Sequence, residues 1–139
     1  MVEFALTLPM LLLVVTGITT FGIAFNNYLT LTEATSVGAR QLTVSRGQTL
    51  DPCNTVSSAV YAAAPVLKQS NITFSITLNG NGYSGTSCSG TSTSGAPAEM
   101  ILGTNAVVTV TYPVGLNLYG IQIVPAGSVM TARTTEVMQ

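Results

Sequence analysis

The sequence predicts an α+β fold in which a long N-terminal hydrophobic helix packs on a small head domain with an antiparallel sheet. The first observation behind this prediction is an apolar run over residues 4–25 that holds no charged side chain. The second is a set of later segments in which apolar and polar residues alternate, which is the period of a β-strand. The chain has 139 residues, enough for one small domain beside such a helix. We therefore expect a helical part over residues 1–46 and an α+β head over residues 47–139.

The apolar run is long enough to cross a membrane. A hydrocarbon core about 30 Å thick needs roughly 20 apolar residues in a helix, and residues 4–25 supply that length. Glu3 is the one ionisable side chain in the first 25 residues. A carboxylate at the head of such a segment is costly in lipid and needs a partner, and the amine at the start of a neighbouring chain would serve. We expect a helix that first sits in a membrane and later packs against copies of itself.

The helix is expected to continue beyond the apolar run to about Arg46. Apolar positions recur there at intervals of three to four residues, which marks one helical face; they are Tyr28, Leu31, Thr35, Ala39 and Leu42. Gly47 is a natural stop signal. The whole helix would be about 70 Å long, so roughly half of it would project beyond the bilayer.

Three residues of the apolar run affect how the helix packs. Pro9 lacks a backbone N–H, which predicts a kink or a short melted stretch around residues 6–10. Gly17 and Gly22 are small enough to let neighbouring helices approach closely. They are equally compatible with simple tolerance in a lone membrane anchor.

Beyond the long helix, the pattern changes to a helix followed by strands. A turn and cap at residues 51–54 precede residues 55–68, whose Ala and Val residues at helical spacing predict a second helix with an irregular last turn at Pro65. Residues 71–78 alternate strictly and predict a half-buried strand with Ile72, Phe74, Ile76 and Leu78 facing inward.

The rest of the chain predicts two more strands and two irregular segments. Residues 79–95 consist almost wholly of Gly, Ser, Thr and Asn and are expected to form a long loop. Residues 106–112 predict a strand that ends at Pro113, and residues 127–138 alternate again. The apolar segment 114–124 has no regular pattern. Three strands in succession favour an antiparallel sheet packed on the amphipathic half of the long helix.

The composition suits an assembly better than a free monomer. Charged residues make up 6% of the chain and its formal net charge is −1, which gives no electrostatic footprint for nucleic acid. Surface charge keeps monomers apart, so a chain this neutral is suited to close packing, although ordinary neutral surfaces also exist.

The two cysteines, Cys53 and Cys88, both follow the apolar run. In a chain placed outside the cytoplasm they predict one disulfide. The bond would close a loop of 36 residues and add roughly 3–4 kcal/mol by the chain-entropy estimate. The alternative is a pair of buried free thiols. A metal site is not expected, because two cysteines without a histidine cannot complete a tetrahedral zinc site.

The sequence offers little for catalysis. It has no histidine, no Gly-rich phosphate loop followed by lysine, and five scattered acidic residues with no paired spacing. Ser57 and Lys68 fall on one predicted helix but about three turns apart, too far for a Ser–Lys pair. We expect no enzyme activity, no catalytic residue and no cofactor.

The N-terminal sequence resembles a known family. Residues 2–13, VEFALTLPMLLL, are similar to the "VEFALVLPLLLLL" start of TadE-type pilins, the type IV-like pilins of tight-adherence (Tad) systems. Gly38-Ala39-Arg40 resembles the "GAR" that closes their amphipathic helix, and the strand ending at Tyr112-Pro113 and residues 131–136 resemble the family's tail. Residues 49–105 match nothing in the family.

The resemblance implies a bacterial inner-membrane prepilin whose short basic leader a prepilin peptidase removes, and which pilus machinery then assembles. It marks Glu3, Phe4 and Pro9 as assembly residues, together with the small Gly17 and Gly22. In the family the glutamate is the fifth residue of the mature chain, whereas here it is third. We therefore expect that residues before Met1 are missing from this sequence or that processing differs.

These observations predict a structural pilin that polymerises through its N-terminal helix into an extracellular filament for adhesion. In such a homopolymer, Glu3 would neutralise the N-terminal amine of a neighbouring subunit and fix the register. One alternative is a minor pseudopilin that primes or caps a fibre of another subunit. A second is a membrane-anchored binding module that uses the loop 79–95, although Tyr83 is the only aromatic residue in that loop.

Overall fold

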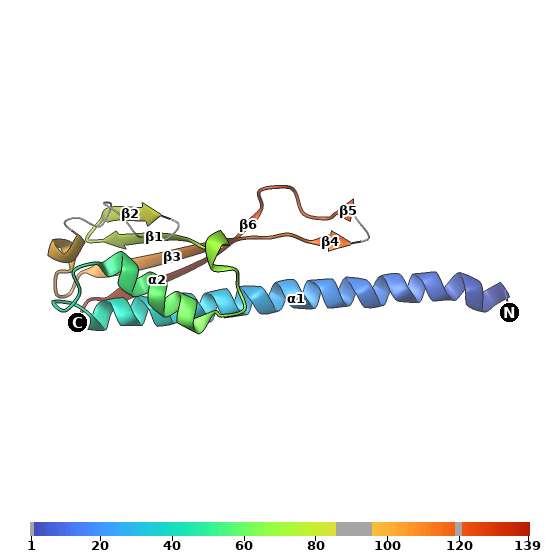
Figure 1. Ribbon diagram of the computed structural model, residues 1–139, viewed down its shortest axis with the longest axis horizontal. Coiled ribbons are helices and arrows are strands. Elements are labelled where there is room, and N and C mark those ends of the chain that lie inside the picture. The colour runs from blue at the N-terminus through green and yellow to red at the C-terminus, as the bar shows by residue number, and fades with distance from the viewer. Residues whose placement is uncertain (1, 86–95, 119–120) are drawn as a thin grey trace.

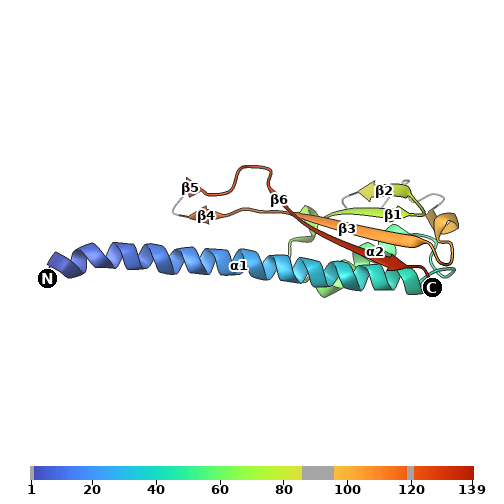
Figure 2. The ribbon, with the colours of Figure 1, turned by 180° about the vertical axis from the view of Figure 1, so that it is seen from behind.

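The computed structural model describes residues 2–85, 96–118 and 121–139, and it shows a long helix that carries a small head at one end (Figure 1). Helix α1 spans Val2–Val44 and helix α2 spans Pro52–Ala63. A four-stranded antiparallel sheet completes the head. Seen from the front and from behind, α1 extends far beyond the head on its N-terminal side (Figures 1 and 2). The predicted α+β fold, with a long apolar helix and a small antiparallel sheet, is confirmed.

Helix α1 runs without interruption through Pro9. Residues 6–10 are all helical, so the expectation of a melted stretch there is wrong. Proline removes the hydrogen bond that its own N–H would donate, and its ring crowds the carbonyl of the residue four positions earlier. The other residues of this 43-residue helix nevertheless keep helical geometry on both sides of Pro9.

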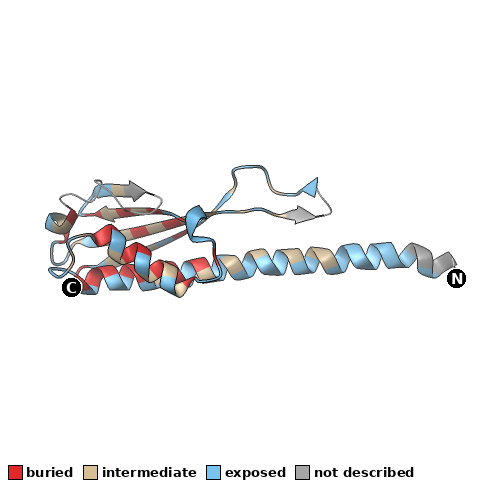
Figure 3. Cartoon of the chain, viewed as in Figure 1, coloured by how far each residue is buried: buried red, intermediate tan, exposed pale blue. Residues whose placement is uncertain are grey.

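Only the C-terminal third of α1 packs on the head. Four of the five positions that the helical periodicity predicts on one face are buried; they are Leu31, Thr35, Ala39 and Leu42. Ala34 is buried as well. Tyr28 is 42% exposed, so its expected place on the buried face is wrong. Figure 3 shows the same change along α1, from exposed residues in the first part to buried residues under the head.

Helix α2 begins three residues earlier than the sequence pattern predicts. Asp51 caps it, since its Oδ1 accepts a hydrogen bond from the backbone N–H of Asn54 at 3.1 Å, and Pro52 occupies the first turn, where its missing N–H costs nothing. The helix ends at Ala63 rather than at residue 68, because the residue before Pro65 is disfavoured in the α conformation.

The sheet has the strand order β2-β1-β3-β6, and each neighbouring pair is antiparallel. The bounds are Thr73–Leu78 for β1, Asn81–Gly85 for β2, Asn105–Pro113 for β3 and Val129–Val137 for β6. Two short 3₁₀ helices, η1 (Gln69–Asn71) and η2 (Ala96–Glu99), join these elements. The inward positions of the strands form the core with the two helices; they are Phe74, Ile76, Leu78, Ala106, Val108, Val110 and Ala132.

Strand β2 was not predicted. The segment expected to be one long loop over residues 79–95 begins as a β-hairpin, because Asn79 and Gly80 both have positive φ, at 48° and 86°. Two central residues with positive φ are typical of the type I′ turn that matches the twist of the two strands. The remainder of the loop, residues 86–95, lies outside the described part.

A ribbon leaves the sheet between β3 and β6, and we call its residues 114–118 and 121–128 the arm. It contains the short antiparallel strands β4 (Asn117–Leu118) and β5 (Ile121–Gln122). Backbone hydrogen bonds hold it together, from the Val114 N–H to the Ser128 carbonyl at 2.9 Å and from the Ile123 N–H to the Leu116 carbonyl at 3.0 Å. The arm extends from the head alongside α1, toward its N-terminal part (Figure 2).

The end of α1 is held to two distant parts of the head by Arg46. Its Nε donates to the Met100 carbonyl at 2.9 Å and its Nη1 donates to the Gln139 main-chain oxygen at 3.3 Å. Gly47 follows with a φ of +74°, a left-handed conformation that terminates helices at low cost in glycine.

Candidate functional site: the exposed half of helix α1

The first part of α1 presents apolar side chains that the head does not cover. No described residue between positions 4 and 25 is buried. Within Thr7–Val44 an 18-residue window has the length and composition to cross a membrane, and none of it is buried by the rest of the chain. The large apolar side chains exposed there are Phe4, Leu8, Met10, Leu11, Leu12, Leu13, Val14, Val15, Ile18, Phe21, Ile23 and Phe25.

The hydroxyl groups of threonines in this segment form hydrogen bonds within α1 itself. The hydroxyls of Thr16, Thr19 and Thr20 donate to backbone carbonyls of the preceding turn at 2.8, 2.9 and 2.8 Å. A hydroxyl bonded in this way does not need water or a second protein group. These polar residues are therefore compatible with a lipid environment or with a dry interface between helices.

The predicted assembly residues all lie on α1. Glu3 is in its first turn, and the side chain of Glu3 lies outside the described part of the structure. Phe4 is 72% exposed and Pro9 is exposed as well. A Cβ atom added at Gly17 or Gly22 would meet nothing within 4 Å. Contacts within the described chain therefore do not require glycine at either position. The role of these glycines in assembly stays a prediction.

The two cysteines are not both described. Cys53 is fully buried in the first turn of α2, against the core of the head. Cys88 lies outside the described residues. The Cys53–Cys88 disulfide therefore stays a prediction.

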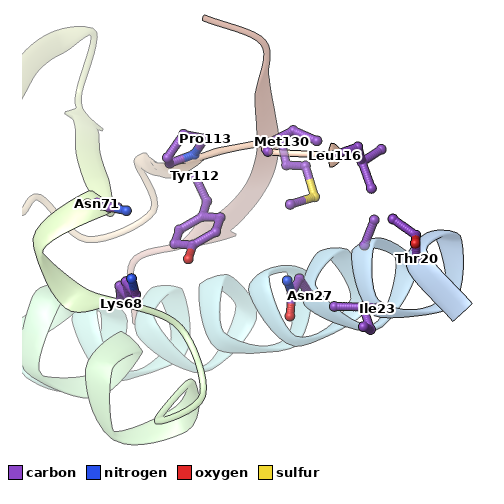
Figure 4. A pocket seen from close by; sticks show the side chains of 12 residues that line it. Thr20, Ile23, Asn27, Lys68, Asn71, Tyr112, Pro113, Leu116 and Met130 are labelled. Atoms are coloured by element: carbon purple, nitrogen blue, oxygen red, sulfur yellow. The ribbon is translucent and has the colours of Figure 1, made fainter. Parts of the chain in front are cut away.

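The structure adds a groove that the sequence did not predict. A cavity of about 590 Å³ lies between α1 and the arm, and it is closed at the head side by the loop after α2 and by β3. Figure 4 shows Thr20, Ile23 and Asn27 on the helix side, opposite Leu116 and Met130, with Lys68, Asn71 and Tyr112 toward the head. We call this cavity the arm groove.

One signal in the sequence could have drawn attention to this region. Residues 100–132 contain no charged side chain, although they include the exposed arm. Within it, residues 114–128 have neither a charge nor strand alternation, which is unusual for a solvent-exposed segment.

Comparison with known families supports the resemblance of the N-terminal segment. Residues 1–40 match the family model described as TadE-like protein. No curated protein and no solved structure gave a match. The matched residues cover most of α1, including its exposed apolar part. The family suggests an association with the Tad pilus, and with the apolar helix it suggests membrane anchoring. Over residues 1–40, the chain is thus similar to the TadE-like family.

Proposed function

We propose that this chain is a structural pilin subunit that polymerises through α1 into an extracellular, Tad-type filament. The observation that carries the proposal is the contrast along α1. Its last third is built into the head, whereas no described residue among the apolar positions 4–25 is buried, and the arm is the part of the described chain that lies beside their last turns. The apolar surface of such a helix has to be covered by lipid while the subunit is in the membrane, and by other helices once it is in a fibre.

The free energy of burying apolar surface favours this sequence of events. Removing apolar surface from water yields about 25 cal/mol per Å², so the exposed side chains of α1 strongly oppose release of the subunit into water. In the inner membrane, lipid covers them. In a fibre, a central bundle of α1 helices from identical subunits covers them instead, and the heads face outward.

Glu3 has a specific role in this proposal. A single carboxylate in the apolar core of a bundle is costly unless a cation lies beside it. The amine at the start of a neighbouring subunit supplies that cation, and the pair then sets the axial register between subunits. The role is structural and requires no catalytic group or cofactor. Prepilin peptidase and the pilus assembly machinery are the partners that this assembly requires.

Electron microscopy of fibres sheared from cells, with mass spectrometry of their subunits, tests the proposal. We expect fibres composed mainly of this chain. Glu3→Ala should abolish them while the cellular level of the protein stays normal. Glu33→Ala is the matched control, because Glu33 is an exposed acidic residue on the head-bound part of the same helix. Fibres that lack this chain, or normal fibres from Glu3→Ala, would contradict the proposed role.

A further inference from the structure

The arm groove lies at the level where the apolar run of α1 ends. Thr20, Ile23 and Ala24 of its lining belong to the run, and Asn27 lies just after it, beyond Phe25. If α1 spans a membrane, this level is the boundary between hydrocarbon and headgroups on the outer side. The groove is therefore placed at a membrane surface while the subunit is inserted.

The two ends of the groove differ in chemistry. Toward the N-terminal side of α1, its walls are the apolar side chains of Ile23 and Leu116, with Met130 beside them. Toward the head, its walls are polar, with Asn71, the Tyr112 ring and Lys68. Of the described residues that line the groove, Lys68 alone is charged. An occupant that suits both ends is apolar at one end and anionic at the other.

The composition of the arm is compatible with contact to lipid. Ile121 is 70% exposed and Ile123 is 57% exposed, and the arm has no charged side chain. Its backbone groups are partly paired within the ribbon, which lowers the cost of leaving water. Lysines at membrane boundaries commonly extend their ammonium group to the headgroup layer.

We propose that the arm groove binds one anionic phospholipid from the outer leaflet of the membrane that α1 spans. The Lys68 ammonium pairs with the lipid phosphate at the head end of the groove. An acyl chain lies between Ile23 of α1 and Leu116 of the arm. The exposed isoleucines of the arm insert beside it, so the subunit contacts the membrane through two elements rather than one.

The chemistry of the lining favours a lipid over a second copy of α1. Residues 4–25 of another α1 carry no charged side chain, so they offer no anion to Lys68. An anionic phospholipid supplies both a phosphate for the Lys68 end and an acyl chain for the apolar end.

The lipid-binding proposal rests on membrane insertion of α1 and not on polymerisation. Lipid binding and filament formation can therefore fail separately.

The first experiment reconstitutes the full chain as a monomer in nanodiscs of phosphatidylcholine with phosphatidylglycerol and counts retained lipids by native mass spectrometry. We expect one phosphatidylglycerol bound to the wild type, at least a fivefold loss of that species in Lys68→Gln, and no loss in Arg133→Gln. Arg133 is exposed on β6 and does not line the groove. Millimolar inorganic phosphate should not displace the lipid. Equal retention by wild type and Lys68→Gln, or displacement by phosphate, would overturn the proposal.

The second experiment uses the absence of tryptophan from the chain. Ile121→Trp places a single tryptophan on the arm, and Leu50→Trp places one at the 92%-exposed Leu50, beyond the end of α1 in the head. In the same nanodiscs, lipids brominated on their acyl chains should quench tryptophan at position 121 and leave tryptophan at position 50 unchanged. An unquenched, water-exposed emission from position 121 would refute membrane contact by the arm and overturn the proposal.

Discussion

At the scale of single residues, the packing of α1 on α2 depends on Gly38. A Cβ atom at this position would lie 2.7 Å from Cγ2 of Val60 and 3.2 Å from Cγ1 of Val56. Valine is stiff about χ1 and cannot move its methyl groups away cheaply. Gly38 is thus the point at which the two helices come into direct contact. The sequence shows only a glycine in a helical segment, and the requirement comes from a second helix whose position the sequence does not give.

We predict that Gly38→Ala destabilises the head. Alanine gains about 1 kcal/mol of helix propensity, but overpacking of this kind costs about 1–3 kcal/mol, so the midpoint of thermal unfolding in detergent should fall. Gly22→Ala is the matched control, because its added methyl group touches nothing in the chain and should leave the midpoint unchanged or higher.

A double variant separates steric overlap from other effects at this site. Val60→Ala removes the methyl group that the new Cβ would strike, so it should cost less in the Gly38→Ala background than in the wild type. If the two substitutions are simply additive in the free energy of unfolding, the direct contact between the helices is not the cause.

At the scale of elements, the alternating segments could be predicted and the turns between them could not. Three predicted strand segments, residues 71–78, 106–112 and 127–138, contain β1, β3 and β6. In the first of them the residues expected to face inward are buried; they are Ile72, Phe74, Ile76 and Leu78. Strand β2 has the composition of a loop, and only the Asn79-Gly80 pair before it indicates a hairpin. The arm has neither alternation nor helical periodicity. Its position beside α1 depends on contacts between residues almost 100 positions apart in the sequence.

Gly80→Ala is expected to weaken the hairpin. Gly80 has a φ of +86° with nothing within 4 Å of an added Cβ, so the cost is backbone strain alone, about 1–2 kcal/mol. Hydrogen exchange of the β2 amides should accelerate more than exchange in β3. Gly82→Ala provides the comparison, since Gly82 lies within β2, has no positive φ and has open space around it. Slower or unchanged exchange in Gly80→Ala would show that the turn does not limit this hairpin.

At the scale of the whole molecule, the sequence predicts a long helix with a small head. It does not predict how the head packs on the helix. The apolar run and the strand pattern predict a helix with a small head, and both are present. The place where the head begins to cover α1 could not be derived in the same way. Tyr28 continues the apolar periodicity but lies before the covered part of the helix, so it stays 42% exposed.

The predicted disulfide is a property of the whole head, because it would join Cys53 in α2 to Cys88, which follows β2 in the sequence. We expect the intact protein to be 2 Da lighter than its reduced form. Reduction should lower the free energy of unfolding by about 3–4 kcal/mol, as expected for a closed loop of 36 residues. Mass spectrometry with and without reductant, followed by denaturant titration, measures both quantities. An unchanged mass after reduction would instead support two free thiols.

The lengthwise packing of α1 on the head has a mechanical consequence. In the proposed fibre, tension would enter each head through α1, and the buried residues Leu31, Ala34, Ala39 and Leu42 follow one another along that helix. A pull along the α1 axis would load all of these contacts together in shear, whereas a pull perpendicular to that axis would break them one after another. The hydrogen bonds from Arg46 to Met100 and Gln139 lie at the far end of this row. They would pass the remaining load to the segments next to β3 and β6, so we expect the head to resist extension as a single unit.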